Sequence, residues 1–219
     1  MEKIYTIPIN EAFDECKNDH ALGCPFCRLY NKLEYNELDL ILGASMMEPD
    51  IRIKTNELGF CDKHFGMMFT SGNRLGLGLI LESHLDTIRS HMDIKHLEKL
   101  ENTCYVCGRI DYSLTKIVEN TVWLWENDPD FDRKMRAQPY FCLPHYRRIM
   151  EYAKNRLNKK KFPAFSQAFS EVTERYFDEL RNDVSWFCKK FDYRYTDEPW
   201  YNSKDAIERA IKFIKDAKL

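Results

Sequence analysis

The sequence predicts a mainly α-helical protein that consists of two helical repeats of about 80 residues, followed by additional C-terminal helices. Three observations support this prediction. The 219 residues include only eight glycines and eight prolines, which is few for a protein of strands and turns. Apolar residues recur every three or four positions in several segments, as on the buried face of an amphipathic helix. The cysteines occur in two similar sets about 80 residues apart, which indicates an internal duplication.

The helices of the first copy are expected in a clear order. A short helix over 11–20 precedes a longer one over 26–42, which has one apolar side and ends before Gly43. A third helix near 74–92 carries apolar residues at every third or fourth position. The polar junction 93–103 is also expected to be helical, so no linker is predicted between the copies.

The second copy repeats this order. Helices are expected over 110–126 and 164–190, and a last helix begins near Ser203. In each copy a proline–aspartate pair, at 49–50 and 129–130, is expected to form a turn. This turn is expected to lead through a short extended segment to a Cys-x-x-His motif that opens the next helix.

Composition excludes several classes of protein. Hydrophobic residues make up 44% of the chain and charged residues 31%, with a net charge of -2, so disorder, collagen-like sequence and a uniformly basic nucleic-acid coat are excluded. The N-terminus lacks the apolar core of a signal peptide. The longest apolar run, LGLGLIL at 75–81, is too short to span a membrane. We therefore expect a cytoplasmic protein without membrane contacts.

The cysteine motifs carry the strongest functional signal. CPFC at 24–27 and CDKH at 61–64 are repeated as CYVC at 104–107 and CLPH at 142–145. The CxxC motifs lie 80 residues apart and the CxxH motifs 81. A two-residue spacer lets two ligand side chains of one turn reach the same metal ion, and three cysteines with one histidine are typical of closed structural zinc sites.

We therefore expect two zinc-knuckle-like Cys₃His sites and two zinc ions per chain. The eight candidate ligands are Cys24, Cys27, Cys61 and His64 in the first copy, and Cys104, Cys107, Cys142 and His145 in the second. We expect residues 1–100 to form repeat one with the first site, and residues 101–219 to form repeat two with the second site and the C-terminal helices. The two repeats can equally pack as one fused domain.

The pairing of the half-sites is not determined by the motifs. Ligands can combine within each copy, or CPFC at 24–27 can combine with CLPH at 142–145 across the copies. We expect pairing within each copy, because it closes the shorter loop at a lower entropic cost.

Other interpretations of the cysteines remain open. An iron–sulfur cluster is compatible with the ligand types. CPFC is similar to the thiol redox motif of glutaredoxins, although the preceding KNDHALG is not a strand, and CYVC lacks the proline. Buried small side chains or disulfides would leave His64 and His145 unexplained. No catalytic residues are identified, and we expect no enzymatic activity.

Five further cysteine and histidine side chains are considered as candidate ligands or reactive groups. Cys16 and His20 lie four residues apart and could extend the CPFC motif into a rival metal site. A buried thiol and a surface histidine are the simpler expectation. His84 and His91 lie on one face of the helix near 74–92, where a ligand-binding groove and the margin of a packed helix are the alternatives. Cys188 is expected to be a spare thiol.

A basic stretch at 147–161 raises the alternative of nucleic-acid binding. It contains one acidic residue, Glu151. Its basic residues are Arg147, Arg148, Lys154, Arg156, Lys159, Lys160 and Lys161. Such a stretch can bind phosphates, or it can be a solvated helix whose basic last turn suits the negative end of the helix dipole.

The motifs and the C-terminal segment KFDYRYTDEPWYNSKDAIERAIKFI together resemble an uncharacterised bacterial family known as a domain of unknown function. The resemblance covers nearly the whole chain and implies a cytosolic helical architecture with metal binding at the eight ligands above. It implies no reaction. The function that the sequence favours is therefore a zinc-binding module that interacts with a protein partner. An iron–sulfur or thiol redox protein and a nucleic-acid-binding protein are the alternatives.

Overall fold

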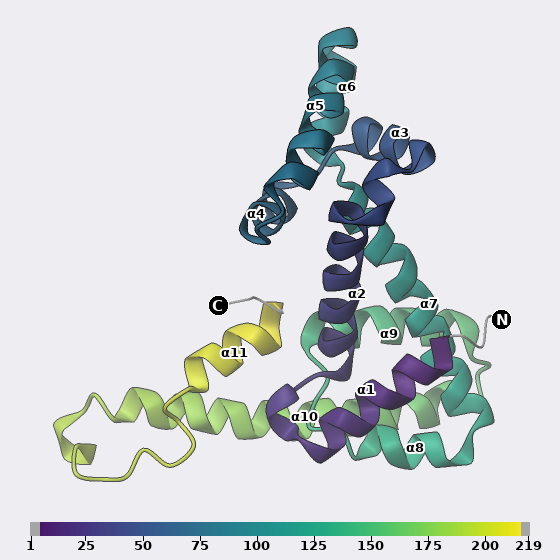
Figure 1. The fold of residues 1–219 in the computed structure, drawn as a ribbon. Helices are drawn as coiled ribbons and strands as arrows, with labels where there is room; N and C mark the ends of the chain where they lie inside the picture. Colours follow the sequence, from purple (N-terminus) through teal and green to yellow (C-terminus); the bar gives the residue numbers. More distant parts are fainter. Residues whose placement is uncertain (1–4, 216–219) are drawn as a thin grey trace. The chain divides into compact units, whose positions relative to one another are not determined.

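The computed structural model describes residues 5–215, and every regular element in this range is a helix (Figure 1). The predicted fold class is thereby confirmed. The α-helices are α1 (Thr6–Asn18), α2 (Pro25–Leu42), α3 (Pro49–Leu58), α4 (Asp62–Thr70), α5 (Arg74–Ser90), α6 (Ile94–Asn102), α7 (Tyr105–Asn127), α8 (Pro129–Arg136), α9 (Leu143–Arg156), α10 (Phe162–Lys189) and α11 (Ala206–Lys215). The short 3₁₀ helices are η2 (His20–Leu22), η3 (Ala44–Met47) and η4 (Tyr193–Tyr195).

The proline–aspartate pairs do not form the turns that the sequence analysis expects. Pro49 and Pro129 instead occupy the first turns of α3 and α8, and the short non-helical segments 59–61 and 140–142 then lead to the Cys-x-x-His motifs. A proline at this position lacks only an N–H that a helix start would leave unpaired, and its fixed φ suits the helix. Asp128 caps α8 by accepting a hydrogen bond from the backbone N–H of Asp130 at 3.0 Å. The same dipeptide is therefore compatible with a turn and with a helix start.

The chain divides into two compact units that do not follow the two sequence repeats. We call Met1–Leu29 with Lys116–Leu219 the outer unit and Tyr30–Thr115 the inner unit. The names refer only to the sequence, in which the two segments of the outer unit flank the inner unit. Each boundary falls within a helix, α2 or α7. Each unit thus combines segments from both copies of the repeat.

The core of the outer unit is dominated by phenylalanine. Phe169 on α10 stacks on Phe141 with ring centroids 4.0 Å apart, and Phe13 on α1 meets Phe26 edge to face at 5.5 Å. Each of these four side chains has 0% exposure. Full burial of such a side chain contributes about 1.5–3 kcal/mol. This aromatic core joins α1 and the start of α2 to the segment around Cys142.

The inner unit has an aliphatic core and a close helix contact. The core members are Leu38, Ile41, Leu42, Phe60, Met68, Leu77, Ile80, Tyr105, Val106 and Ile110. At its edge, Asn73 caps α5 by accepting from the Gly76 N–H at 2.9 Å and donates to the carbonyl of Leu42 at 2.7 Å. A Cβ at Gly76 would lie 2.8 Å from that same carbonyl oxygen. The close approach of α5 to the end of α2 therefore requires glycine there.

Among the described residues, none of the helices combines the length and the apolar character that crossing a membrane requires.

Candidate metal centres

All four cysteine motifs lie at the beginnings of helices. Cys61 and Cys142 are the N-cap residues of α4 and α9. The CxxC motifs begin one residue before α2 and α7. Residues three apart in a first helical turn share one face, so each motif presents both of its ligands in one direction. The unpaired N–H groups and the positive dipole end at a helix start also favour thiolates.

The structure brings the half-sites together across the copies. The outer centre contains Cys24, Cys27, Cys142 and His145, and the inner centre contains Cys61, His64, Cys104 and Cys107. Within each centre the four ligand atoms lie within 4.8 Å of one another and could hold a metal ion. The outer centre belongs entirely to the outer unit and the inner centre to the inner unit. The expected pairing within each copy is therefore wrong.

The two possible pairings differ little in the entropic cost of closing their loops. Pairing Cys27 with Cys142 spans 115 residues instead of the 34 between Cys27 and Cys61, which costs only about 1 kcal/mol more. The direction of α2 outweighs this cost. Its 18 residues carry the chain about 27 Å away from the CPFC motif before CDKH is reached.

The outer centre is compact and mostly buried. The Nδ1 of His145 lies 3.0 Å from the sulfur of Cys142, 3.5 Å from that of Cys27 and 4.0 Å from that of Cys24. The sulfurs of Cys27 and Cys142 are 3.4 Å apart. Phe26 packs against the His145 ring with centroids 5.9 Å apart, so the aromatic core borders the centre.

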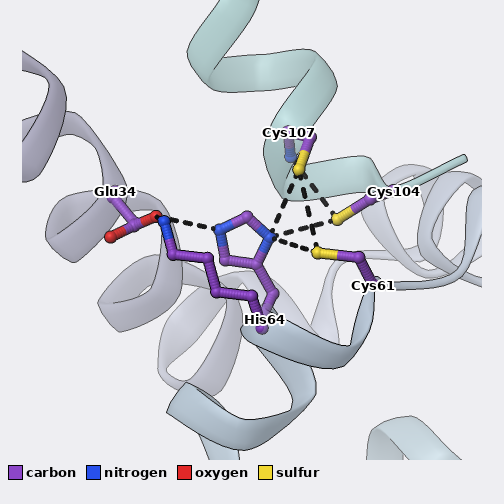
Figure 2. Close-up of polar contacts among 6 residues, drawn as sticks. Glu34, Cys61, His64, Cys104 and Cys107 are labelled. Atoms are coloured by element: carbon purple, nitrogen blue, oxygen red, sulfur yellow. Dashed lines mark hydrogen bonds and ion pairs between the residues drawn. The ribbon is translucent and has the colours of Figure 1, made fainter. Parts of the chain in front are cut away.

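The inner centre has the same arrangement but is more exposed (Figure 2). The Nδ1 of His64 faces three sulfurs, at 3.2 Å from Cys61, 3.2 Å from Cys104 and 3.5 Å from Cys107. The sulfurs of Cys61 and Cys107 are 3.8 Å apart. His64 is fully buried, whereas Cys107 is exposed.

These separations fit four ligands around a single ion. A tetrahedral zinc ion, with Zn–S of about 2.3 Å and Zn–N of about 2.0 Å, places its sulfurs about 3.8 Å apart and sulfur and nitrogen about 3.5 Å apart. The sulfur–nitrogen distances in the two centres run from 3.0 to 4.0 Å and bracket this value. Both donor sets therefore pass a geometric test for a tetrahedral ion.

Electrostatics oppose the ionisation of several thiols in these centres at once. Partial burial, together with the neighbouring thiols of Cys104 and Cys61, raises the pKa of the Cys107 thiol to about 12. In the outer centre burial opposes ionisation of Cys24, but hydrogen bonds from Cys142, Cys27 and His145 outweigh it and lower its pKa. The pKa of Cys27 is raised by its hydrogen bonds to Cys142 and Cys24. A bound cation would lower the pKa values of the cysteines that surround it and so stabilise all three thiolates of a centre.

Glu34 supports the inner centre from behind the histidine. Its Oε1 lies 3.2 Å from the Nε2 of His64, on the side of the ring opposite the sulfurs (Figure 2). The same oxygen forms an ion pair with Lys63. Glu34 has 0% exposure, and a carboxylate is buried at such depth only when it is paired. A carboxylate that accepts from a ligand histidine fixes the ring and increases the basicity of the ligand nitrogen.

The role of Glu34 was not predicted, although the sequence contains one signal for it. Glu34 lies four residues after Tyr30 and four before Leu38, and therefore within the apolar face of α2. A charged residue in that face indicates a buried partner. At the 80-residue offset the second copy has Leu114, so the two copies differ at this position.

The other sulfur and imidazole groups stay outside the two centres. Cys16 is fully buried, which raises the pKa of its thiol to about 12, and His20 is exposed. His84 is buried with its Nδ1 3.1 Å from the carbonyl oxygen of Asn56, and burial lowers its pKa. Cys188 is exposed. The structure does not bring Cys16 and His20 into a ligand set with Cys24 and Cys27.

The basic stretch lies on α9 and the turn that follows it. Arg147 pairs with Glu151 at 3.0 Å, and Lys161 pairs with Glu126 at 2.9 Å. Lys159 and Lys160 are exposed in the turn. At least these two of the seven basic side chains are thus neutralised locally. Nucleic-acid binding through these residues stays a prediction.

The fold and the two centres define an all-helical protein with a duplicated sequence and two Cys₃His ligand sets that could bind metal. A family model described as a family of unknown function (DUF6062) matches the chain twice, over residues 1–96 and 93–218. The chain therefore belongs to this family, and the two matches agree with the predicted duplication. Comparisons with curated proteins and with solved structures give no match.

The pairing across the copies predicts metal stoichiometry in double variants. Replacing Cys24 and Cys142 with serine removes ligands from one centre only, so one of two bound ions is expected to be lost. Replacing Cys24 and Cys61 damages both centres, so both ions are expected to be lost. Mass spectrometry of the dialysed proteins counts the ions. The opposite pattern would show that ligands pair within each copy.

Glu34→Gln is expected to weaken the metal affinity of the inner centre about 10–100-fold, the usual effect of losing a carboxylate behind a ligand histidine. Competition with a chromophoric chelator measures this affinity. Asp39→Asn is the matched control, because Asp39 is an exposed acid on the same helix. Equal affinities for the two variants would mean that Glu34 does not support the centre.

Proposed function

We propose that this protein is a non-enzymatic, zinc-stabilised helical protein that presents a folded surface to a protein partner. The observation that carries the proposal is the convergence of two complete Cys₃His sets, each with the separations of one tetrahedral ion. Zinc is favoured because it commonly adopts this geometry with thiolate and imidazole ligands.

The geometry favours single ions over iron–sulfur clusters. In a [4Fe–4S] cluster each protein ligand binds a different iron atom, so the ligand atoms lie further apart than around one ion. Both centres instead hold all ligand atoms within 4.8 Å. The glutaredoxin-like alternative also lacks its structural context, because the residues before CPFC form η2 and not a strand.

A structural role is supported by the number of ligands. Four protein ligands fill a tetrahedral zinc ion and leave no position for a substrate or a catalytic water. Each ion would instead fasten two helix starts that are distant in sequence, 115 residues apart for Cys27 and Cys142 and 40 for His64 and Cys104. Metal binding would thereby contribute directly to folding.

The segment after α10 supports a role in partner binding. Phe191 is 75% exposed and Tyr193 is 88% exposed. The segment is nevertheless ordered by Lys190, whose ammonium donates to the carbonyls of Tyr195 at 2.6 Å and Thr196 at 2.8 Å. Exposed aromatic side chains on a rigid support suit protein interfaces, because little conformational entropy is lost on binding.

Protein purified without oxygen is expected to contain two zinc ions per chain and no iron. Its absorbance between about 350 and 450 nm should stay flat after anaerobic reconstitution with iron and sulfide, because no cluster forms. Removal of zinc with a chelator should lower the thermal midpoint, since the ions bind only the folded chain. Fewer than one zinc per chain, or a stable absorbance band with bound iron, would contradict the proposal.

The aromatic segment predicts a specific loss of partner binding. The variant Phe191→Ala/Tyr193→Ala should fold normally, because both side chains are largely exposed. Some proteins that are cross-linked to the wild type in cells should not be cross-linked to this variant. Tyr35→Ala is the control, since Tyr35 is 70% exposed and lies in the other unit. Identical cross-linked sets from all three proteins would rule out this surface.

A further inference from the structure

A polar cavity in the outer unit lies outside the ligand sets of the metal centres. It has a volume of 690 Å³, within the range of about 300–1,000 Å³ that small-molecule sites occupy. Its walls come from 20–23, from 136–140 at the end of α8 and just after it, from α10, and from 202–212, which includes part of α11. Every one of these segments belongs to the outer unit.

The cavity wall carries an excess of positive charge. Four cationic side chains, Arg136, Arg175, Arg209 and Lys212, line it together with the two carboxylates Glu179 and Asp205. The formal charge of the wall is therefore +2, from four positive and two negative groups. Arg136 and Arg209 are neutralised by carboxylates, three of which lie outside this lining, so the positive charge open to an anion comes from Arg175 and Lys212.

Two of the arginines are held rigidly by partners. Arg136 donates from Nε to Asp132 at 2.8 Å and from Nη1 to Glu171 at 2.6 Å. Arg209 donates from Nη2 to Asp183 at 2.9 Å and from Nε to Asp205 at 3.0 Å. These contacts fix the planes of the guanidinium groups before any ligand arrives.

The remaining two cations lack a carboxylate partner among the described residues. Arg175 makes one hydrogen bond, from Nη2 to the backbone carbonyl of Gln138 at 3.1 Å. A guanidinium has five N–H donors, so four of them are available. Lys212, on α11, forms no ion pair with the described part of the chain and offers three more. Arg175 and Lys212 are thus the natural anchors for an anion.

A pair of stacked tyrosines completes the wall. Tyr140 and Tyr176 lie face to face, with centroids 4.0 Å apart and planes 13° from parallel. Gly23 makes room for this pair: its φ is +74°, and a Cβ there would lie 2.6 Å from the Tyr140 hydroxyl. The cavity therefore combines cationic donors with aromatic surface.

We propose that this cavity binds a small molecule through a phosphate group. A phosphate offers three or more oxygens to donors that approach from α8, α10 and α11, whereas a carboxylate offers only two. The volume exceeds that of a phosphate alone, so the organic part of a phosphate ester has room beside the tyrosines. Free phosphate shares the anchoring chemistry.

Calorimetry of the metal-loaded protein at constant ionic strength tests the proposal. The probes are ribose 5-phosphate, adenosine 5′-monophosphate, inorganic phosphate and succinate. A phosphate ester is expected to bind saturably with a Kd below about 1 mM, and succinate is not. Tighter binding of an ester than of inorganic phosphate identifies an ester site, and the reverse identifies a site for free phosphate.

The variant Arg175→Gln/Lys212→Gln locates the site. It is expected to bind the preferred phosphate probe at least about tenfold more weakly, because two charged hydrogen-bond donors are lost. The matched control is Arg181→Gln/Lys215→Gln, which removes two exposed cations from the same helices and should bind normally. Unchanged metal content and circular dichroism show that each variant is folded.

Lys212→Gln alone keeps the test decisive if the double variant misfolds, since this side chain is exposed and forms no ion pair with the described residues. It should by itself weaken binding of the phosphate probe. Three results would overturn the proposal: no saturable binding of any phosphate probe by the wild type, binding of succinate without phosphate, or equal affinity for the wild type and the cavity variants. Failure of this test leaves the metal stoichiometry untouched, so the two proposals can be judged separately.

Discussion

The constraint on which the rest of the structure depends is the meeting of two helix starts at each metal centre. Each helix start presents two ligands on one face, but four are needed to surround an ion, so two starts must converge. In the outer centre the starts of α2 and α9 converge, and in the inner centre those of α4 and α7. These meetings determine which segments share a unit. They also explain why the compact units cut across the duplicated sequence instead of following it.

The two centres have the same types of ligand but are surrounded by different residues. The outer centre is bordered by the aromatic core, with Phe26 against His145. The inner centre depends more on electrostatics, because Glu34 holds the far side of His64 and Lys63 balances the carboxylate. Exposure differs accordingly: Cys142 is fully buried, whereas Cys107 is exposed. Duplication thus preserved the ligands while the supporting residues diverged, as the exchange of Glu34 for Leu114 illustrates.

Local patterns were sufficient to predict the longer helices and the eight candidate ligands, because both depend on spacing within a turn or two, but they did not predict α3 and α8. Properties that depend on tertiary packing could not be predicted in this way. Loop entropy separates the two possible pairings by only about 1 kcal/mol, so the motifs could not decide between them. Pro49 suits a turn and a helix start equally well. Glu34 was visible as a single charge in an apolar face, but its partner was 30 residues away. The polar cavity is assembled from four separate segments, and no single segment indicates it.

The exchange of half-sites has a consequence for the origin of the duplicated chain. One copy alone contains one CxxC and one CxxH motif, and in this structure the two motifs of each copy belong to different centres. An ancestor with a single copy would therefore need a second molecule to complete its centres. Each centre would then contain the CxxC motif of one subunit and the CxxH motif of the other. Such a two-fold arrangement closes on itself and needs no third subunit. Fusion of the two genes would then turn an obligate homodimer into one polypeptide and free each half to change independently.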